Sequence, residues 1–397
     1  MAVHRSEFTV PAASKPPVSA ARGARRWLED LLAQADVRID GDRPWDLRLH
    51  APGVPERVLA QGSLGLGEAY MDGDWSAERL DQLFERIVRA RLADQVQPLS
   101  IVWHHLKARW TNRQTARRAW EVGRRHYDLD DDVYQAMLDP RMTYTCGYWA
   151  QAQDLAQAQE HKLEMVCRKL RLRPGMRLLD IGCGWGSLMR YAAERHGVRC
   201  VGVTVSERQV ALGRAMCRGL PVEFRLQDYR DIDGRYDAIA SLGMFEHVGR
   251  RNDAAFMRVA RRCLADDGLF LLHTIGRNED GHGTDAWIDR YVFPNGELPT
   301  LARLGRAFER RFVVEDLHNF GADYDRTLMA WHANIEAAWP RFAQRLGERF
   351  RRQWRYYLLS CAGAFRARDI QLWQFVLSKD GLRGGYERPA APSATLA

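Results

Sequence analysis

The chain has 397 residues, of which 46% are hydrophobic, so it can bury an ample core and form about two domains rather than a single small module. The net charge of +8 and the pI near 9.2 favour an anionic partner, either a nucleic acid or an acidic membrane surface. No apolar run approaches the roughly 18 residues that span a bilayer, and the N-terminus lacks a signal peptide's hydrophobic segment, so we expect a cytoplasmic protein.

The two ends of the chain frame two predicted domains. Residues 1–22 begin with an aperiodic stretch rich in Ala, Ser and Pro, and residues 388–397 are similar, so we expect both to be disordered tails. Residues 23–110 are predicted to form a small accessory domain with a linker, and residues 111–387 the catalytic domain. The accessory domain should contain a helix at 27–34, a strand at 46–50, a glycine-rich segment at 62–70 and an amphipathic helix at 77–91.

Basic residues cluster at 22–26, 107–125 and 345–355. The third cluster is interleaved with or flanked by Phe350, Trp354, Tyr356 and Tyr357. Mixed basic and aromatic helices suit the headgroup boundary of a membrane. A solvated helix face is an equally good interpretation of each cluster taken singly.

Cysteine usage excludes two kinds of site. The seven cysteines are odd in number and no two form a C-x-x-C pair, so we expect neither a disulfide framework nor a metal site. Most should pack as small hydrophobic residues. Cys146 is the exception of interest, because it belongs to the run YTCGYW at 144–149, just ahead of the catalytic core. This run and the turn at 126–129 are candidates for a lid over the site.

The most informative stretch is DIGCGWG at residues 180–186, which follows the apolar run 176–179. It is typical of a strand that ends in a glycine turn and opens a helix, where a ligand can approach the backbone and meet unpaired N–H groups. The spacing is G-x-G-x-G, which is neither the dinucleotide G-x-G-x-x-G nor the phosphate-binding G-x-x-x-x-G-K-[ST]. S-adenosylmethionine (SAM) fits this turn better than NAD or a nucleoside triphosphate.

Repeated βαβ units follow the glycine turn. A helix at 188–196 stops at Gly197, and the further strands are predicted at 199–205, 222–226, 236–242 and 269–272. The fold class is therefore α/β, with a doubly wound Rossmann-like sheet. Glu246 and His273 follow strand ends, which share one crevice in such a sheet, so either is a candidate base. A satisfied structural histidine is the competing interpretation of His273.

Taken together, these blocks resemble the cyclopropane-fatty-acyl-phospholipid synthases, a SAM-dependent branch of the class I methyltransferases. The resemblance covers nearly the whole chain and is carried, in order, by QGSLGLGE (61–68), YTCGYW (144–149), DIGCGWG (180–186), GVTVS (202–206), QDYRD (227–231), GMFEHVG (243–249), HTIG (273–276), FPNG (293–296), HNFGADY (318–324) and CAGAFR (361–366). One departure is Asp130-Asp131, where the family usually has Gly-Asn, and it adds charge near the lid.

The resemblance implies transfer of a methylene group from SAM to the cis double bond of unsaturated acyl chains in phospholipids. The alkene would attack the SAM methyl group, and the resulting carbocation would lose a proton as the ring closes. A bound bicarbonate ion would act as base, held by Cys146, Glu246, His273, Tyr324 and the backbone at Ile275. Aromatic walls could stabilise the cation, although ordinary core packing explains them equally well; these are Phe245, Tyr148, Trp149 and Tyr324.

For the cofactor, the resemblance implies contacts to the methionine portion of SAM from Tyr144, Thr145, Gly182 and Gly184. Thr204 and Gln209 would lie near the ribose, Asp228 near the adenine, and Asp180 in the same pocket. The resemblance also implies a homodimer. Peripheral attachment to an anionic membrane, on its inner face, would give access to the lipid. No nucleic-acid partner is expected.

Several alternatives stay open at this point. A related enzyme could place a methyl or methylene branch, or act on mycolic acids. The positive charge permits a nucleic-acid methyltransferase, which should bind RNA with a steep salt dependence. A catalytically idle lipid-binding scaffold would keep the fold without the reaction.

Overall fold

The computed structural model describes residues 18–96, 131–280 and 283–392. The basic cluster at 107–125 and the turn predicted at 126–129 lie outside these residues, as do most of the N-terminal tail and half of the C-terminal one. Asp131, the second residue of the family departure, begins helix α8 (Asp131–Met137) and lies 3.6 Å from Arg208. An acidic residue in the first turn of a helix is favourable, so the change suits the local structure.

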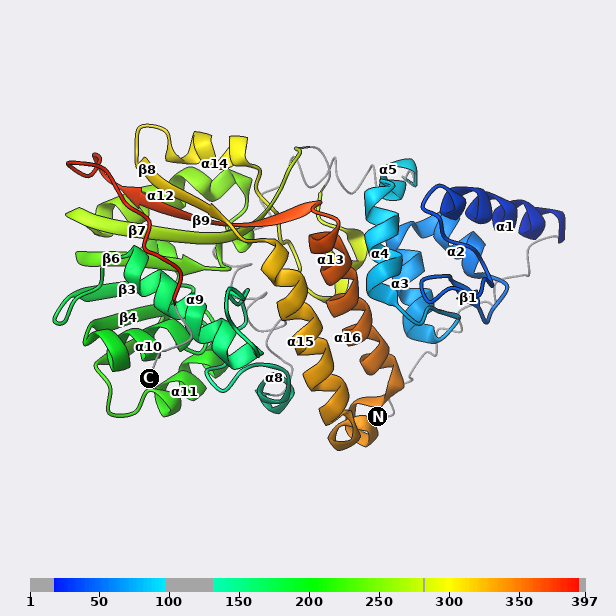
Figure 1. Cartoon of the computed structure of the whole chain (residues 1–397), viewed down its shortest axis with the longest axis horizontal. Helices are drawn as coiled ribbons and strands as arrows, with labels where there is room; N and C mark the ends of the chain where they lie inside the picture. Colours follow the sequence, from blue (N-terminus) through cyan, green and yellow to red (C-terminus); the bar gives the residue numbers. More distant parts are fainter. Residues whose placement is uncertain (1–17, 97–130, 281–282, 393–397) are drawn as a thin grey trace, which may run out of the picture.

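A seven-stranded sheet in the order β5-β4-β3-β6-β7-β9-β8 forms the centre of the molecule (Figure 1). The first five strands of the sheet in this order run parallel, whereas β9 pairs antiparallel with both β7 and β8. The α/β prediction is confirmed. The strands are β3 (Arg177–Ile181), β4 (Arg199–Thr204), β5 (Val222–Leu226), β6 (Tyr236–Leu242), β7 (Leu264–Arg277), β8 (Val313–Asn319) and β9 (Ile370–Ser378).

Helices cover both faces of this sheet, as a doubly wound fold requires. One core cluster joins the sheet to α12 (Asp253–Cys263) and α14 (Leu301–Phe308), and another joins it to α9 (Leu155–Lys169), α10 (Ser187–His196) and α11 (Glu207–Met216). Because both faces are covered, strands such as β3 and β6 are buried along almost their whole length, which explains their apolar runs.

Most predicted elements of the sheet are observed where the sequence placed them. The strands at 222–226 and 236–242 match β5 and β6, and helix α10 ends where Gly197 adopts a φ of 63°. β7 is much longer than the predicted 269–272, because pairing with β9 continues through its polar end to Arg277. The apolar run marked only the part of β7 that lies deepest in the core.

The N-terminal part is mainly helical and differs from the prediction in detail. The predicted strand at 46–50 is reduced to the two-residue β1 (Arg48–Leu49), and the glycine-rich segment lies mostly inside helix α3 (Ser63–Asp72). Glycine is needed at positions 65 and 67 of this helix, because a Cβ atom there would collide with the Arg57 carbonyl group and the Trp287 ring, respectively. The remaining elements are α1 (Val18–Ala33), α2 (Val54–Gln61), β2 (Trp75–Ser76), α4 (Leu80–Arg89) and α5 (Leu92–Gln95).

Ordered structure extends into both predicted tails. Helix α1 begins at Val18, within the predicted tail 1–22, and its buried face starts at Ala24 and Leu28. At the other end, Arg388 pairs with Asp316 at 2.5 Å, so contacts reach the first residue of the predicted tail 388–397.

The N-terminal helices share a hydrophobic core with the C-terminal helices. Leu28 and Phe84 belong to the same cluster as Trp331 of α15 (Ala322–Ala338) and Tyr356 of α16 (Ala343–Arg366). Figure 1 shows α16 between α15 and the N-terminal helices. At Gly363 the backbones of α16 and α4 approach so closely that an added Cβ would lie 2.7 Å from the Asp81 carbonyl oxygen. The proposed division at residue 110 therefore cuts across one continuous core.

Helix α16 carries the basic cluster 345–355, and several of its arginines form ion pairs with other parts of the chain. Ion pairs join Arg345 to Asp132 and Arg349 to Asp72, and both Arg351 and Arg355 to Glu336. Trp354, Tyr356 and Tyr357 are buried. This helix therefore joins the N-terminal part to α15, and its ion pairs account for these four arginines without a membrane.

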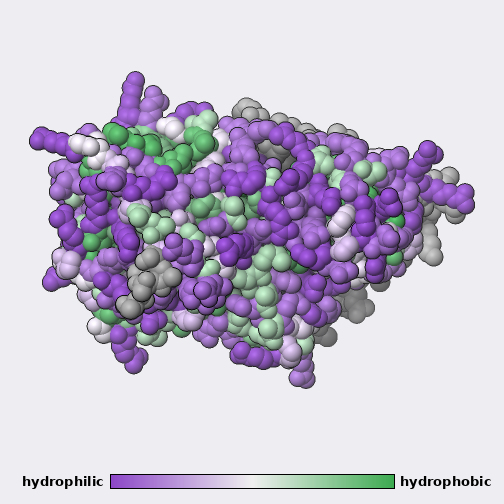
Figure 2. Space-filling model, in the orientation of Figure 1, coloured by the Kyte–Doolittle hydropathy of each residue, from purple (hydrophilic) through white to green (hydrophobic). Residues whose placement is uncertain are grey.

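Apolar side chains are exposed elsewhere, on the edge strand of the sheet. Val313, Val314 and Leu317 of β8 are each about two-fifths exposed or more, and so is Leu301 at the start of α14. Figure 2 shows apolar residues gathered over these two elements on an otherwise largely polar face. None of the helices in the described ranges is long and apolar enough to cross a bilayer.

Candidate active site

The glycine turn after β3 has the backbone that its sequence requires. Gly182, Gly184 and Gly186 have φ values of 82°, 54° and 86°, which side-chain-bearing residues rarely adopt. A Cβ on Gly182 would lie 2.5 Å from the Met244 side chain, and one on Gly186 would collide with Phe224. A Cβ on Gly184 would meet no protein atom within 4 Å. Gly182 and Gly186 thus permit close packing, whereas Gly184 borders open space where a ligand can approach the backbone.

Two of the predicted cofactor residues lie around one buried lysine. Lys162 of α9 is fully buried and donates from Nζ to Thr145 Oγ1 at 2.7 Å. Burial lowers the pKa of Lys162 to about 8, while the nearby acids Asp139 and Asp180 oppose that shift. Burial raises the pKa of Asp180 to about 7, and Lys162 counteracts it. Because Thr145 accepts a hydrogen bond from Lys162, its own hydroxyl proton is available to a ligand.

The remaining cofactor candidates lie at the ends of β4 and β5. Thr204 Oγ1 donates to Gln209 Oε1 at 2.7 Å, which leaves the Gln209 amide nitrogen as a donor for a ligand. Asp228 begins the 3-10 turn η1 (Tyr229–Asp231) and accepts a hydrogen bond from Arg230 Nη1 at 2.8 Å. If adenine binds Asp228, it therefore binds a carboxylate that also accepts a hydrogen bond from Arg230.

Glu246 is buried in the 3-10 turn η2 (Phe245–His247), which follows β6. Its Oε1 accepts a hydrogen bond of 2.6 Å from the backbone N–H of Ile275. Its Oε2 is also buried and makes no hydrogen bond within the described part of the chain. Burial raises the pKa of Glu246 to about 7, although the backbone N–H groups of Ile275 and Glu246 itself and the nearby Thr274 side chain oppose the shift. The Ile275 N–H, which the resemblance assigns to the bicarbonate site, is thus occupied by Glu246 in this structure.

His273 is buried in the middle of β7. Its Nδ1 lies 3.1 Å from Nε2 of Gln374, and its Nε2 has no hydrogen-bond partner among residues 18–96, 131–280 and 283–392. Burial lowers the pKa of His273 well below its usual value, and Lys162 and Lys169 lower it further. His273 is therefore a neutral ring with one unpaired polar atom, and the interpretation as a satisfied structural histidine is wrong for that atom.

The segment 144–149 is attached to helix α15, which carries Tyr324. Thr327 Oγ1 accepts hydrogen bonds from the backbone N–H of Gly147 at 3.1 Å and from Trp149 Nε1 at 2.9 Å. Cys146 Sγ lies 3.9 Å from the same oxygen and donates to the Gly147 carbonyl group. The segment is a packed wall of the site in this structure.

Several of the catalytic candidates influence one another's pKa values. Burial raises the pKa of Tyr324 well above its usual value, and Cys146, Glu246 and Tyr144 raise it further. Lys162, which holds Thr145, also lowers the pKa of His273. These influences are consistent with one candidate site built from four segments, while Thr204 and Asp228 lie at the ends of β4 and β5. Aromatic rings pack against one another beside these residues. The distances between ring centroids are 5.2 Å for Tyr144 and Trp331, 6.0 Å for Tyr324 and Trp331, and 4.5 Å for Tyr324 and Phe365.

Comparison with known proteins gives this arrangement a family. A sequence model of the family described as mycolic acid cyclopropane synthetase matches residues 114–375. The chain is also 50% identical over 368 residues to the cyclopropane-fatty-acyl-phospholipid synthase of Escherichia coli (strain K12), covering 90% of this chain and 95% of that protein. The chain belongs to the cyclopropane synthase family. The resemblance stated from the motifs is confirmed.

Solved structures of cyclopropane synthases agree with the fold. The cyclopropane synthase MmaA2 from Mycobacterium tuberculosis matches with a TM-score of 0.61 and 32% identity, covering 66% of this chain and 98% of that one. The mycolic acid cyclopropane synthase CmaA1, solved in complex with SAH and CTAB, matches with the same values. The chain is thus a SAM-dependent methyltransferase with the class I fold.

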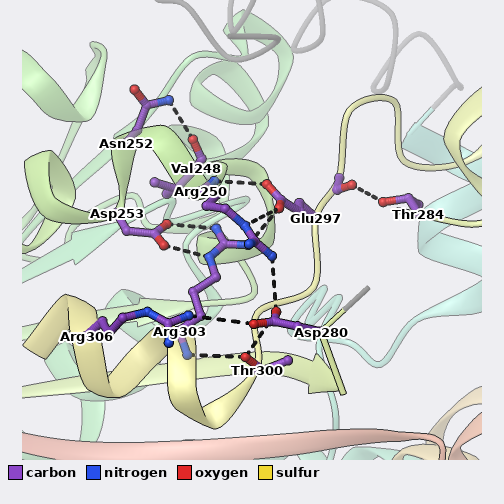
Figure 3. A network of polar contacts seen from close by, with 11 residues as sticks. Val248, Arg250, Asn252, Asp253, Asp280, Thr284, Glu297, Thr300, Arg303 and Arg306 are labelled. Atoms are coloured by element: carbon purple, nitrogen blue, oxygen red, sulfur yellow. Dashed lines mark hydrogen bonds and ion pairs between the residues drawn. The ribbon is translucent and has the colours of Figure 1, made fainter. Parts of the chain in front are cut away.

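A network of ion pairs centred on the buried Arg303 lies next to the turn that carries Glu246; Figure 3 shows the network itself. Arg303 makes two hydrogen bonds to Asp253, at 2.6 and 2.8 Å, and its Nη1 lies 3.2 Å from Glu297 Oε1. Glu297 in turn donates its backbone N–H to the Glu246 carbonyl oxygen at 2.8 Å. The network therefore joins α12, α14 and the segment before α14 to the turn that carries Glu246. In this cyclopropane synthase fold it fixes the position of the candidate base site.

Removing the central arginine should loosen this support. We expect Arg303→Met to lower the free energy of unfolding by about 3 kcal/mol, because it leaves the buried Asp253 carboxylate without its partner and removes one of the two arginines beside Glu297. The turnover number should fall as well, since Glu246 loses its fixed position. Urea denaturation and initial-rate measurements test both effects.

Arg306 offers a matched control for that variant. Its side chain is 63% exposed and lies 3.6 Å from Asp280 at the edge of the same network. Arg306→Met should change stability by less than about 0.5 kcal/mol. Equal effects of the two substitutions would show that the network does not support the site.

The sequence interpretation missed the residues behind the site, namely Lys162, Lys169, Gln374 and Thr327. Gln374 had a usable signal, because it is a polar residue inside the apolar strand β9. The two lysines lie in α9, whose sequence alternates polar and apolar residues without marking either one as buried. Their role depends on which strands α9 covers, and that is a property of the whole fold.

Proposed function

We propose that this protein transfers a methylene group from SAM to the cis double bond of unsaturated acyl chains in phospholipids, forming cyclopropane fatty acids. The observation that carries the proposal is a pair of buried polar atoms, Glu246 Oε2 and His273 Nε2, for which the described chain provides no partner. These atoms lie in a site enclosed by aromatic rings, where a carbocation and its proton acceptor are both needed. The Escherichia coli relative with 50% identity supports the choice of lipid substrate.

The chain's own residues meet the demands of such a reaction. SAM supplies the electrophilic methyl group that the alkene attacks. Burial of Glu246, His273 and Tyr324 excludes the water that would otherwise trap the cation. The faces of Tyr324, Trp331 and Tyr144 provide negative electrostatic potential that stabilises a cation near them.

We further propose that bicarbonate binds at this site. Bicarbonate would supply a small base deep in the lipid pocket. Glu246 Oε2, as carboxylate, can accept a hydrogen bond from the ion's hydroxyl group, and His273 Nε2 can donate to one of its oxygens. Burial raises the pKa of both Tyr324 and Cys146 and keeps them protonated, so the Tyr324 hydroxyl group is available as a hydrogen-bond donor, whereas the Cys146 thiol would have to turn from the Gly147 carbonyl group to which it now donates. The unpartnered atoms therefore match the hydrogen-bonding groups of that ion.

The cofactor residues are assigned in the same proposal. Gly184 leaves room for SAM beside the glycine turn, while Thr145 and Tyr144 contact its methionine portion. Asp180 contributes a carboxylate whose ionisation a cationic ligand would favour. Thr204 with Gln209 and Asp228 bind the ribose and the adenine, and Gly182 permits the packing beneath them.

Attachment to the membrane completes the proposal. The net charge of +8 supports binding to an anionic surface, and the exposed apolar residues of β8 and α14 suit contact with acyl chains. We propose a cytoplasmic homodimer that binds the inner face of the membrane peripherally, with a second protomer strengthening attachment. Sedimentation in the presence and absence of vesicles measures both the oligomeric state and the binding.

A vesicle assay tests the reaction. Purified protein is incubated with SAM and phosphatidylglycerol vesicles that carry one cis-unsaturated chain, and the fatty acids are analysed by mass spectrometry. We expect each converted chain to gain one CH₂ and to lose its alkene signal. Vesicles with fully saturated chains serve as the control. A branched or still unsaturated product would indicate a related fatty-acyl methyltransferase, and SAM binding without any product would indicate a lipid-binding scaffold.

A further inference from the structure

Three polar side chains lie in a row across the antiparallel end of the sheet. Gln374 is fully buried in β9, between β7 and β8. In the strand register it stands opposite His273 on β7 and opposite His318 on β8. Lys169, at the end of α9, reaches this row with its ammonium group, which lies 2.8 Å from Gln374 Oε1 and 3.1 Å from His318 Nδ1.

These contacts determine which way the Gln374 amide faces. A lysine ammonium group only donates, so the Gln374 atom that it contacts is the amide oxygen. Burial lowers the pKa of Lys169 to about 7, and Asp316, whose Oδ2 lies 3.8 Å from Nζ, opposes this shift. The neutral amine also has N–H groups that can donate to the amide oxygen. The Gln374 amide nitrogen therefore faces His273 Nδ1 at 3.1 Å and donates a hydrogen to it.

The direction of that hydrogen bond sets the proton position on His273. A neutral imidazole carries one proton, and an Nδ1 that accepts a hydrogen bond leaves this proton on Nε2. Nε2 is the buried atom for which no partner exists in the described residues. The chain of contacts from Lys169 through Gln374 thus delivers an N–H donor to the candidate active site.

We propose that Lys169 and Gln374 are positioning residues that hold His273 as its Nε2-protonated tautomer. The inference rests on the proposed function for its effect on turnover, whereas the tautomer itself does not depend on the reaction. A buried lysine loses its hydration, and here its hydrogen bonds go to polar side chains next to the site rather than to backbone carbonyl groups. Packing alone would be served by apolar residues of the same size.

Gln374→Glu tests the proposal with a minimal change in shape. A carboxylate can still accept from Lys169, but it cannot donate to His273, so the ring proton should move to Nδ1. We expect kcat to fall by about 100-fold or more, as for other catalytic histidines held in the wrong tautomer, while the KM for SAM changes little. Gln371→Glu, the same substitution at a buried position of the same strand, is the control and should retain most activity.

The tautomer is read directly by NMR on protein with ¹⁵N-labelled histidine, with the His273 signals assigned by their loss in His273→Asn. The wild type should show a protonated Nε2 and an unprotonated Nδ1, and Gln374→Glu the reverse. Lys169→Met, which frees the amide to rotate, should show both tautomers and a smaller loss of kcat.

Three results would overturn the proposal: a wild-type ring protonated at Nδ1, an unchanged tautomer in Gln374→Glu, or a switched tautomer with normal kcat. The wild-type spectrum decides the first even if the variants fold poorly. Absence of cyclopropane product from the wild-type enzyme would contradict the proposed function and leave the tautomer measurement valid.

Discussion

Replacing Glu246 with glutamine is expected to lower kcat by about 100- to 10,000-fold, the range for loss of a group that handles a proton in the transition state. The variant keeps an oxygen for the Ile275 N–H but places an amide NH₂ group where Oε2 would accept a hydrogen bond. The dissociation constant for SAM should stay within about twofold, because Glu246 follows β6 and is not in the glycine turn. Initial rates with vesicles and calorimetric titration with SAM measure the two quantities. Normal turnover would remove Glu246 from the base site.

The same variant should be more stable than the wild type in alkaline solution. The pKa of Glu246 is raised from 4.5 to about 7 by burial. Because the folded-state pKa is the higher one, stability is complete below pH 4.5 and declines as the pH rises through 7. Glutamine has no charge to bury, so at pH 8 the variant should gain about 3 kcal/mol, and at pH 5 less than about 1 kcal/mol. Thermal unfolding of the ligand-free proteins at the two pH values measures this. A gain that does not depend on pH would contradict the assignment.

Replacing Gly184 with valine is expected to abolish SAM binding, with an affinity loss of at least about 100-fold. A Cβ at this position meets no protein atom within 4 Å, so the added side chain would occupy space that the fold itself leaves open. Loss of SAM binding would therefore show that SAM occupies this space. Equilibrium dialysis with labelled SAM gives the affinity.

Gly219 provides the matched control, because it separates backbone strain from exclusion of the ligand. Its φ of 84° is also in the left-handed region, and a Cβ there would likewise meet no atom within 4 Å. It lies between α11 and β5, outside the glycine turn. Both valine variants should lose about 1–2 kcal/mol of stability to strain, but only Gly184→Val should lose SAM. Retained binding in that variant would place the cofactor elsewhere.

Local patterns predicted the parallel half of the sheet well, because its strands are short apolar runs bounded by glycine turns. The turn at Gly182, Gly184 and Gly186 could be interpreted from spacing alone, and the structure gives it the expected backbone. Glu246 and His273 were candidates because each follows a predicted strand, and parallel topology brings strand ends together. Glu246 does follow β6, whereas β7 continues past His273 to Arg277.

The antiparallel end could not be predicted in the same way. β9 contributes Gln374 to the site only because it pairs with β7, a partner about a hundred residues earlier in the chain. The burial of Lys162 and Lys169 depends likewise on how α9 packs against the completed sheet. The ion pairs of the arginines in 345–355 could not be predicted for a similar reason, since their acidic partners Asp72, Asp132 and Glu336 are distant in sequence. Charge clusters do not reveal their counterions.

Because α4 and α16 approach closely at Gly363, truncation of the N-terminal part would expose buried surface on α16. A fragment that starts at Asp131 would keep every candidate catalytic residue, yet it would bare the face of α16 on which Phe84 and Tyr70 lie against Tyr356. Solvent-exposed aromatic surface of that kind promotes aggregation. Residues 18–96 therefore shield an aromatic face of the rest of the chain from solvent.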